Sequence, residues 1–310
     1  MAENKNQEKS EWYNVKQNHN FGYKAMLVML KILPAPFMRS LAFPIGFFYW
    51  LFGKSTRRVS KEYLRHVGKK STFNHIISFA LNLVENIQSW AGKFSFEDLT
   101  VPGEDIHDLW KNVDSGRGIV IMISHLGNAQ MMKGLAALGE SGTAKKMSIT
   151  TIFDTEISSG LNSLLNQINA EAGLRLVNSN DIGPETILLL QERLEQGEVI
   201  VVAGDRVGAY SDRYITMPFL GEEADFPYGA FLLLALLNAP TYFLNGLRKK
   251  DISIFPEYEM YVKKNSVDFN CGRKEREERI RQTAENYRNN LEELCRKHPY
   301  QWYNFYDFWK

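Results

Sequence analysis

From residue 118 onward, the sequence alternates between short apolar runs and longer stretches with the three-to-four-residue spacing of amphipathic helices. The predicted strands are residues 119–123, 148–153, 174–177, 198–203, 241–247 and about 253–262. The predicted helices are residues 128–138, 184–196, 228–237 and a segment near 161–168. This alternation is typical of an α/β fold with a mostly parallel central sheet flanked by helices.

The composition divides the chain into three regions. We predict a polar N-terminal lead-in at residues 1–20, a membrane-associated helical segment at 21–58 and an α/β domain at 59–310. The lead-in has no apolar core of the kind that a secretory signal needs. The formal net charge of +1 argues against general nucleic-acid binding, and the two separate cysteines indicate a reduced, cytoplasmic environment.

The most apolar and aromatic stretch is residues 21–53, and three prolines interrupt it. Its run of residues 40–52, which contains no charged residue, is shorter than the roughly 20 residues that cross a bilayer. We therefore expect two short helices, bent at the prolines, that lie in one leaflet of a membrane. The basic residues Lys54, Arg57 and Arg58 would then meet lipid headgroups. The alternative is a buried helical hairpin in a soluble core.

The C-terminal part has two distinct patterns. Residues 273–298 are highly charged but place apolar side chains along one stripe, which predicts an amphipathic helix. Residues 300–309 then contain seven aromatic side chains in the sequence YQWYNFYDFW. We expect this terminal segment to dock onto the core or onto the mouth of a pocket.

One of the six histidines follows the end of a predicted strand. His125 comes after residues 119–123, Gly127 permits a turn, and Asn128 is suited to the N-cap of the next helix. Open α/β sheets bind ligands at the carboxyl ends of their strands. His125 is therefore a candidate catalytic residue, although a buried histidine with a purely structural hydrogen bond is the alternative.

A second candidate site follows strand 198–203 at the same expected edge of the sheet. Arg206 can bind a phosphate or an oxyanion through two parallel hydrogen bonds, and Asp205 can orient it. The alternative is an ordinary surface ion pair. The sequence has no glycine-rich phosphate loop, no zinc-ligand spacing and no GxSxG motif, so we predict no metal and no dissociable cofactor.

At residues 124–130, Ser-His-Leu-Gly-Asn-Ala-Gln resembles the H-x4-D/E block of the lysophospholipid acyltransferase superfamily, in particular the lipid A biosynthesis (lauroyl/myristoyl) acyltransferases. The resemblance extends to residues 204–206, 218–221, 226–229 and 301–306 and to the apolar segment 21–53. Each motif is weak alone, but their order and spacing together are specific.

The resemblance implies a membrane-associated acyltransferase on the cytoplasmic face of the cell inner membrane. It would move a fatty acyl group from an acyl carrier protein or coenzyme A thioester to a lipid A-like or other amphiphilic acceptor. His125 would be the general base, and Arg206 would handle phosphate or oxyanion charge. Substrate-binding positions would be Gly127, Asn128, Phe219 and Tyr228.

The chain departs from the family block at its last position, where Gln130 replaces the carboxylate. A glutamine can accept a hydrogen bond from an imidazole, but it carries no charge to stabilise the imidazolium. Three outcomes are open: the enzyme works with the amide, another carboxylate such as Asp205 or Asp154 takes the role, or a catalytically impaired protein keeps only lipid or acyl-carrier binding. We favour retained catalysis.

Overall fold

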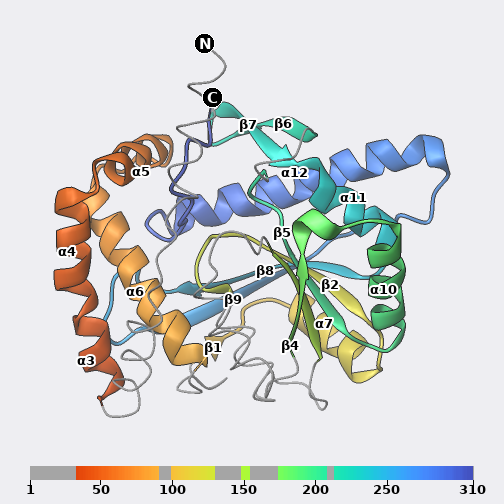
Figure 1. Cartoon of the computed structure of the whole chain (residues 1–310), viewed down its shortest axis with the longest axis horizontal. Helices are drawn as coiled ribbons and strands as arrows, with labels where there is room; N and C mark the ends of the chain where they lie inside the picture. Colours follow the sequence, from red (N-terminus) through yellow and green to blue (C-terminus); the bar gives the residue numbers. More distant parts are fainter. Residues whose placement is uncertain (1–32, 91–98, 130–147, 154–173, 208–212, 310) are drawn as a thin grey trace.

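A computed structural model of the chain describes residues 33–90, 99–129, 148–153, 174–207 and 213–309. Within these residues, seven strands form one sheet in the order β1-β9-β8-β2-β5-β3-β4 (Figure 1). The strands are β1 Leu99–Thr100, β2 Ile119–Ile123, β3 Ile149–Phe153, β4 Leu174–Asn178, β5 Val199–Ala203, β8 Thr241–Arg248 and β9 Tyr258–Lys264. Neighbouring strands are parallel except β8 and β9. The expected mostly parallel sheet is confirmed.

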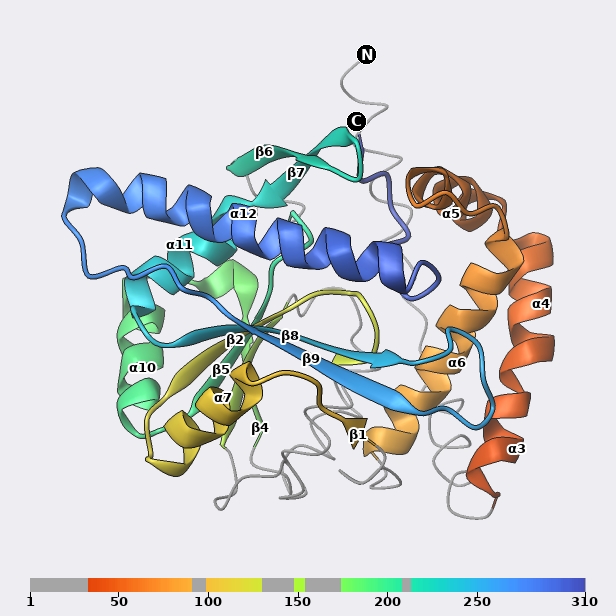
Figure 2. The same cartoon turned by 180° about the vertical axis from the view of Figure 1, so that it is seen from behind.

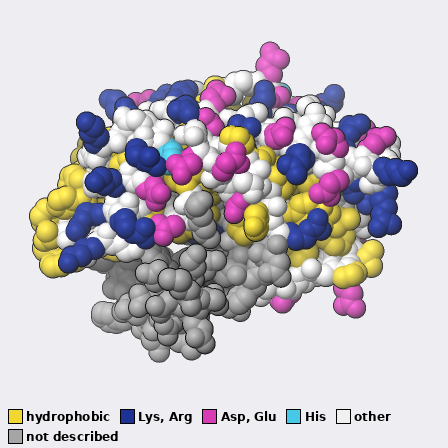
Figure 3. All heavy atoms as spheres, turned by 90° about the horizontal axis from the view of Figure 1, so that it is seen from above, with side chains coloured by type: hydrophobic (Ala, Val, Ile, Leu, Met, Phe, Trp, Pro, Cys, Tyr) yellow, Lys and Arg dark blue, Asp and Glu magenta, His cyan; other side chains and the backbone are white. Residues whose placement is uncertain are grey.

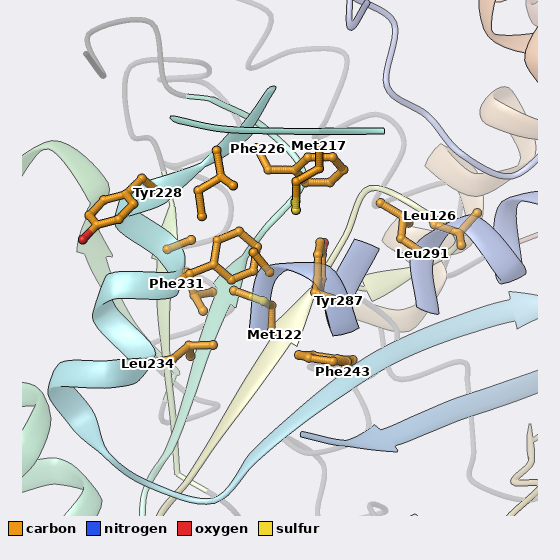
Figure 4. Close-up of a cluster of buried hydrophobic side chains, with 14 of the residues drawn as sticks. Met122, Leu126, Met217, Phe226, Tyr228, Phe231, Leu234, Phe243, Tyr287 and Leu291 are labelled. Carbon is orange, nitrogen blue, oxygen red and sulfur yellow. The ribbon is translucent and has the colours of Figure 1, made fainter. Parts of the chain in front are cut away.

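Helices cover both faces of this sheet. They include α7 Asp105–Asp114, α10 Pro184–Glu195, α11 Tyr228–Leu237 and α12 Arg273–Lys297. Met122 of β2 packs into one core cluster with Phe231 of α11 and Tyr287 of α12 (Figure 4). Ile121 of the same strand packs on the opposite face with Leu109 of α7. A strand buried on both faces requires apolar residues at successive positions, as the sequence of β2 has.

Several predicted elements differ from the structure at their bounds. β9 begins at Tyr258 rather than near residue 253. An antiparallel hairpin of β6 Tyr214–Phe219 and β7 Glu222–Pro227 lies outside the main sheet, and its second strand was not predicted because its first two residues are charged and exposed. The predicted helix at residues 128–138 is described only as far as residue 129. The predicted helix near residues 161–168 lies wholly outside the described residues.

The N-terminal helices form a layer at one end of the sheet (Figure 1, Figure 2). They are α3 Ala35–Ser40, α4 Ala42–Phe52, α5 Lys54–His66 and α6 Thr72–Trp90. The described part of the predicted segment holds two short helices, α3 and α4, and the break between them falls at Leu41. Pro44 does not break α4, because it lies in the first turn, where its missing N–H is not needed. Residues 1–32 lie outside the described residues.

Helix α4 presents apolar side chains on both of its sides. Its inner side packs closely on α6, since a Cβ atom at Gly46 would lie 2.8 Å from Ile77 Cδ1. Its outer side chains are exposed, with Phe48 at 59% and Phe52 at 75%. A helix buried as a hairpin in a core would hide these rings. None of the helices in the described part of the chain combines the length and apolar character needed to cross a membrane.

The aromatic C-terminal segment docks onto the core, as expected. After α12 the chain turns back and ends beside α5 and the β6–β7 hairpin (Figure 2). Trp302 is fully buried, and its ring contacts those of Tyr63, Phe219 and Phe308 at centroid distances of 5.0, 5.4 and 4.9 Å. The segment therefore joins the N-terminal helices to the hairpin.

Candidate functional site

The site lies where β2 and β5 end. These two strands are parallel neighbours, and Ile123 at the end of β2 pairs with Ala203 at the end of β5. The Gly204 N–H donates to the Ile123 carbonyl at 3.0 Å, which continues the pairing one residue further. The residues that follow both strands are therefore brought together at one edge of the sheet, where open α/β sheets bind their ligands.

His125 and Asp205 form a close pair at this edge. His125 Nδ1 lies 2.8 Å from Asp205 Oδ1, and the backbone N–H of His125 donates to Asp205 Oδ2, also at 2.8 Å. The Asp205 side chain is fully buried, whereas the His125 side chain is 34% exposed. The Asp205 carboxylate is therefore bonded by both the backbone and the ring of His125, while the imidazole reaches the surface.

Burial works against ionisation of the Asp205 carboxyl, but its partners outweigh this effect. The charge and the hydrogen bonds of His125, together with the nearby Arg206 guanidinium, hold the pKa of Asp205 below its ordinary value. Asp205 is therefore an anion at neutral pH. A carboxylate can only accept hydrogen bonds, so in neutral His125 the shared proton is on Nδ1, and Nε2 is the basic nitrogen.

The turn after His125 depends on one glycine. Gly127 has a φ of +75°, and a Cβ atom there would lie 2.2 Å from the Gly246 carbonyl oxygen. The next residue, Asn128, donates its backbone N–H to the same carbonyl at 2.7 Å and is buried. These two residues hold the His125 turn against the end of β8.

Arg206 is held by the C-terminal segment. Its Nε donates to Asn304 Oδ1 at 2.7 Å, and its Nη2 donates to the Tyr303 carbonyl at 3.1 Å. The sequence predicted that Asp205 would orient Arg206. The Asp205 carboxylate oxygens bond to His125 and Trp302, and Arg206 donates a side-chain hydrogen bond to Asn304 while its charge also acts on Asp205.

The two aromatic residues predicted to bind substrate lie in different surroundings. Phe219 is fully buried and packs on Trp302 and Phe308, so it presents no surface to a ligand in this arrangement. Tyr228 begins α11 and donates its hydroxyl to Glu277 at 2.7 Å. Figure 4 shows the Tyr228 hydroxyl pointing away from the core cluster.

Gln130 and Asp154, the other two residues weighed for the carboxylate role, lie outside the described residues. The carboxylate that contacts His125 in the structure is Asp205, from a different strand. Sequence reasoning had considered Asp205 for this position, since it follows β5 as His125 follows β2.

Sequence reasoning missed the contribution of three C-terminal residues. Trp302 donates its indole N–H to Asp205 Oδ2 at 2.9 Å, Tyr303 donates its backbone N–H to the His125 carbonyl at 2.9 Å, and Asn304 bridges Asp205 and Arg206. The unusual density of aromatic residues predicted that this segment docks, but nothing in it indicated which residues it contacts.

Among the described residues, no group of three or more His, Cys, Asp or Glu side chains is arranged to hold a metal ion. The site is a histidine–carboxylate pair on an α/β sheet, which is an arrangement suited to moving a proton to and from a reacting group.

The family model for the bacterial lipid A biosynthesis acyltransferases matches residues 8–310. The match covers nearly the whole chain, so the protein belongs to this family, and the resemblance read from its motifs is confirmed. Membership implies an acyltransferase of the lipid A type. A search of the curated proteins found no match to this chain.

Proposed function

We propose that this protein moves a fatty acyl group from a thioester donor to a hydroxyl or amine of an amphiphilic acceptor, with His125 as the general base. The observation that carries this proposal is the 2.8 Å contact between His125 Nδ1 and the buried Asp205 carboxylate. This contact leaves Nε2 as the basic nitrogen of a partly exposed ring. It also supplies the negative charge that Gln130 lacks.

In the proposed reaction, His125 Nε2 takes the proton of the acceptor O–H or N–H. The acceptor atom forms a bond to the thioester carbonyl carbon, and the carbon–sulfur bond then breaks. The thiolate that leaves takes the proton from the His125 imidazolium. Asp205 stabilises the imidazolium while it exists, and we assign oxyanion or phosphate charge to Arg206, whose guanidinium acts on Asp205.

The donor is a thioester of acyl carrier protein or coenzyme A, and the acceptor is a lipid A-like or other amphiphilic molecule. Family membership supports a lipid A-type acceptor. The reaction as written balances without a metal or a dissociable cofactor, because every proton that it moves passes through His125.

We place the protein at the cytoplasmic face of the inner membrane, with α4 and α5 against the lipid. The exposed rings of α4, Phe48 and Phe52 among them, come shortly before exposed Lys54, with which α5 begins. Figure 3 shows hydrophobic side chains at the left edge of the molecule, bordered by Lys and Arg. Apolar side chains beside basic ones suit a surface of anionic lipid.

A second candidate is a catalytically impaired protein that binds lipid or acyl carrier on the same fold. Gln130 is the observation that favours it. The ionised Asp205 beside His125 weighs against it, because the pair supplies both the orientation and the charge that the family block provides.

The test is to incubate the purified protein with acyl carrier protein thioester and a bacterial lipid extract, and to follow thioester loss and lipid mass together. We expect an acylated lipid that disappears in His125→Ala. Bound lipid without any turnover would favour the impaired protein, and free fatty acid without acylated lipid would indicate a hydrolase. Full activity in folded His125→Ala would remove the histidine from the mechanism.

A further inference from the structure

The segment 301–306, here called the C-terminal clamp, contacts both loops of the site. Leu126 and Trp302 form an antiparallel bridge, in which the Gly127 N–H donates to the Gln301 carbonyl at 2.8 Å and the Tyr303 N–H donates to the His125 carbonyl at 2.9 Å. The clamp thus pairs with the His125 turn as a short extra strand would.

The clamp also reaches the loop after β5. Asn304 donates its side-chain N–H to the backbone carbonyl of Asp205 at 3.1 Å, and its side-chain oxygen accepts from Arg206 Nε at 2.7 Å. Trp302 donates its indole N–H to Asp205 Oδ2 at 2.9 Å. The buried carboxylate therefore accepts three N–H groups, of which Oδ1 receives the His125 ring and Oδ2 receives the other two.

Buried contacts hold the clamp itself in place. The Tyr303 hydroxyl accepts from Arg248 Nη2 at 2.6 Å, and Arg248 forms an ion pair with Glu85 at 2.7 Å in which both side chains are 2% exposed. His75 Nε2 donates to the backbone carbonyl of Trp302 at 2.8 Å. A segment fixed by so many partners can define the position of Asp205 closely.

We propose that Trp302 is a positioning residue for the His125–Asp205 pair, and that its indole N–H fixes the orientation of the carboxylate toward the imidazole. This inference rests on the proposed function of that pair. With Oδ2 occupied by the indole and by the His125 backbone, Oδ1 is held toward Nδ1. Without the indole donor, the carboxylate can rotate, and its charge is less neutralised.

The experiment compares Trp302→Phe with Trp309→Phe, a matched control just beyond the clamp. The Trp309 indole N–H donates to the Phe219 carbonyl at 3.1 Å, and its ring is also buried. Both variants lose one indole hydrogen bond and keep an aromatic ring, but only Trp302 touches Asp205. The readouts are kcat and KM for acyl transfer, and the titration of the His125 ring followed by NMR on protein with ¹⁵N-labelled histidine.

We expect Trp302→Phe to lower kcat about 10- to 100-fold with little change in KM, since hydrogen bonds to charged groups contribute ~1.5–3 kcal/mol. We also expect its His125 ring to titrate at higher pH than in the wild type, because the less neutralised carboxylate holds the imidazolium more strongly. Trp309→Phe should change neither quantity. The inference is overturned if His125 titrates alike in all three proteins or if both variants shift it equally.

If Trp302→Phe does not fold, the same question is put to Asp205→Asn. Loss of the carboxylate should move the NMR signal of the Trp302 indole N–H and leave that of Trp309 in place, and an unmoved Trp302 signal would contradict the proposal. The NMR titration needs no turnover. A failure of the proposed function, such as full activity in His125→Ala, is therefore distinguishable from a failure of the positioning role.

Discussion

The two most aromatic stretches of this chain are treated in opposite ways by the fold. In α4, Phe48 and Phe52 remain largely exposed, whereas in the C-terminal segment Trp302, Phe308 and Trp309 are buried. Apolar content alone does not separate these stretches. The C-terminal residues find specific partners, including the Asp205 carboxylate for Trp302 and the Phe219 carbonyl for Trp309.

The difference shows that one composition can serve two purposes. Among the described residues, the outer side of α4 has no partner of comparable specificity. The inner side of this helix packs closely on α6. The C-terminal segment instead joins the two loops of the site to the core. We therefore expect changes in the two stretches to affect different properties, namely attachment to lipid and integrity of the site.

The largest effect on stability is expected from Trp302→Ala. Removing a fully buried tryptophan leaves a cavity and takes away one of the two N–H donors to Asp205 Oδ2, and such truncations cost about 3–5 kcal/mol. Urea unfolding at pH 7 measures this change, with Phe52→Ala as the control. The contrast between the stretches would be broken if the two variants lost the same free energy of unfolding.

The next largest effect is a loss of folding stability at acidic pH, which we expect from His75, a buried residue that contacts the C-terminal segment. Burial lowers the pKa of His75 from 6.5 to about 4, so this ring is neutral in the folded protein. Between these two pH values the unfolded chain binds more protons than the folded one, and stability falls as the pH is lowered. The contribution of His75 is about 3 kcal/mol across this range.

A neutral replacement should remove that contribution. In His75→Gln, an amide can still contact Ser60 and the Trp302 carbonyl, the two partners of the imidazole. Unfolding measured in urea from pH 7 to pH 4 should show a smaller loss of stability than in the wild type. His107→Gln, at an exposed position, should follow the wild type, and equal pH dependence in His75→Gln would contradict the assignment.

The smallest effect on stability is expected on the outer side of α4. Phe52→Ser should change the free energy of unfolding by less than about 0.5 kcal/mol, because the ring is already exposed. The double variant Phe48→Ser with Phe52→Ser should nevertheless weaken binding to vesicles that contain phosphatidylglycerol at least about tenfold. Sedimentation with vesicles measures this binding.

The control for vesicle binding is Leu188→Ser. Leu188 is 66% exposed on α10, which lies at the opposite end of the molecule from α4 (Figure 1). This variant should bind vesicles as the wild type does. If it weakens binding as much as the α4 variant, or if the α4 variant binds normally, α4 is not the surface that faces the lipid.

Much of this fold could be predicted from the sequence because its signals are local. The continuous apolar run of β2 and the Gly-Pro start of α10 each follow from neighbouring residues. The bounds of β9 and the strand β7 could not be predicted, because pairing partners rather than local pattern decide where they lie. β7 is stabilised by pairing with β6, and its charged residues give no apolar alternation.

The site could be predicted in part for the same reason. The positions of His125 and Asp205 at one edge follow from the rule that parallel strands end together. Their direct contact does not follow from it, since the sequence equally allowed Asp205 to face Arg206. The roles of Trp302 and Asn304 depend on partners 97 and 98 residues away in the chain, for which no local signal exists.

The central claim is that Asp205 supplies the carboxylate for His125, and Asp205→Asn tests it most directly. The variant keeps the size of the side chain and removes its charge, and we measure kcat for acyl transfer beside Gln130→Glu. In the serine-protease triad the equivalent change lowers turnover about 10⁴-fold. We predict a loss of about 10³- to 10⁴-fold in folded Asp205→Asn and little gain in Gln130→Glu. Activity near the wild-type level in Asp205→Asn would contradict the account.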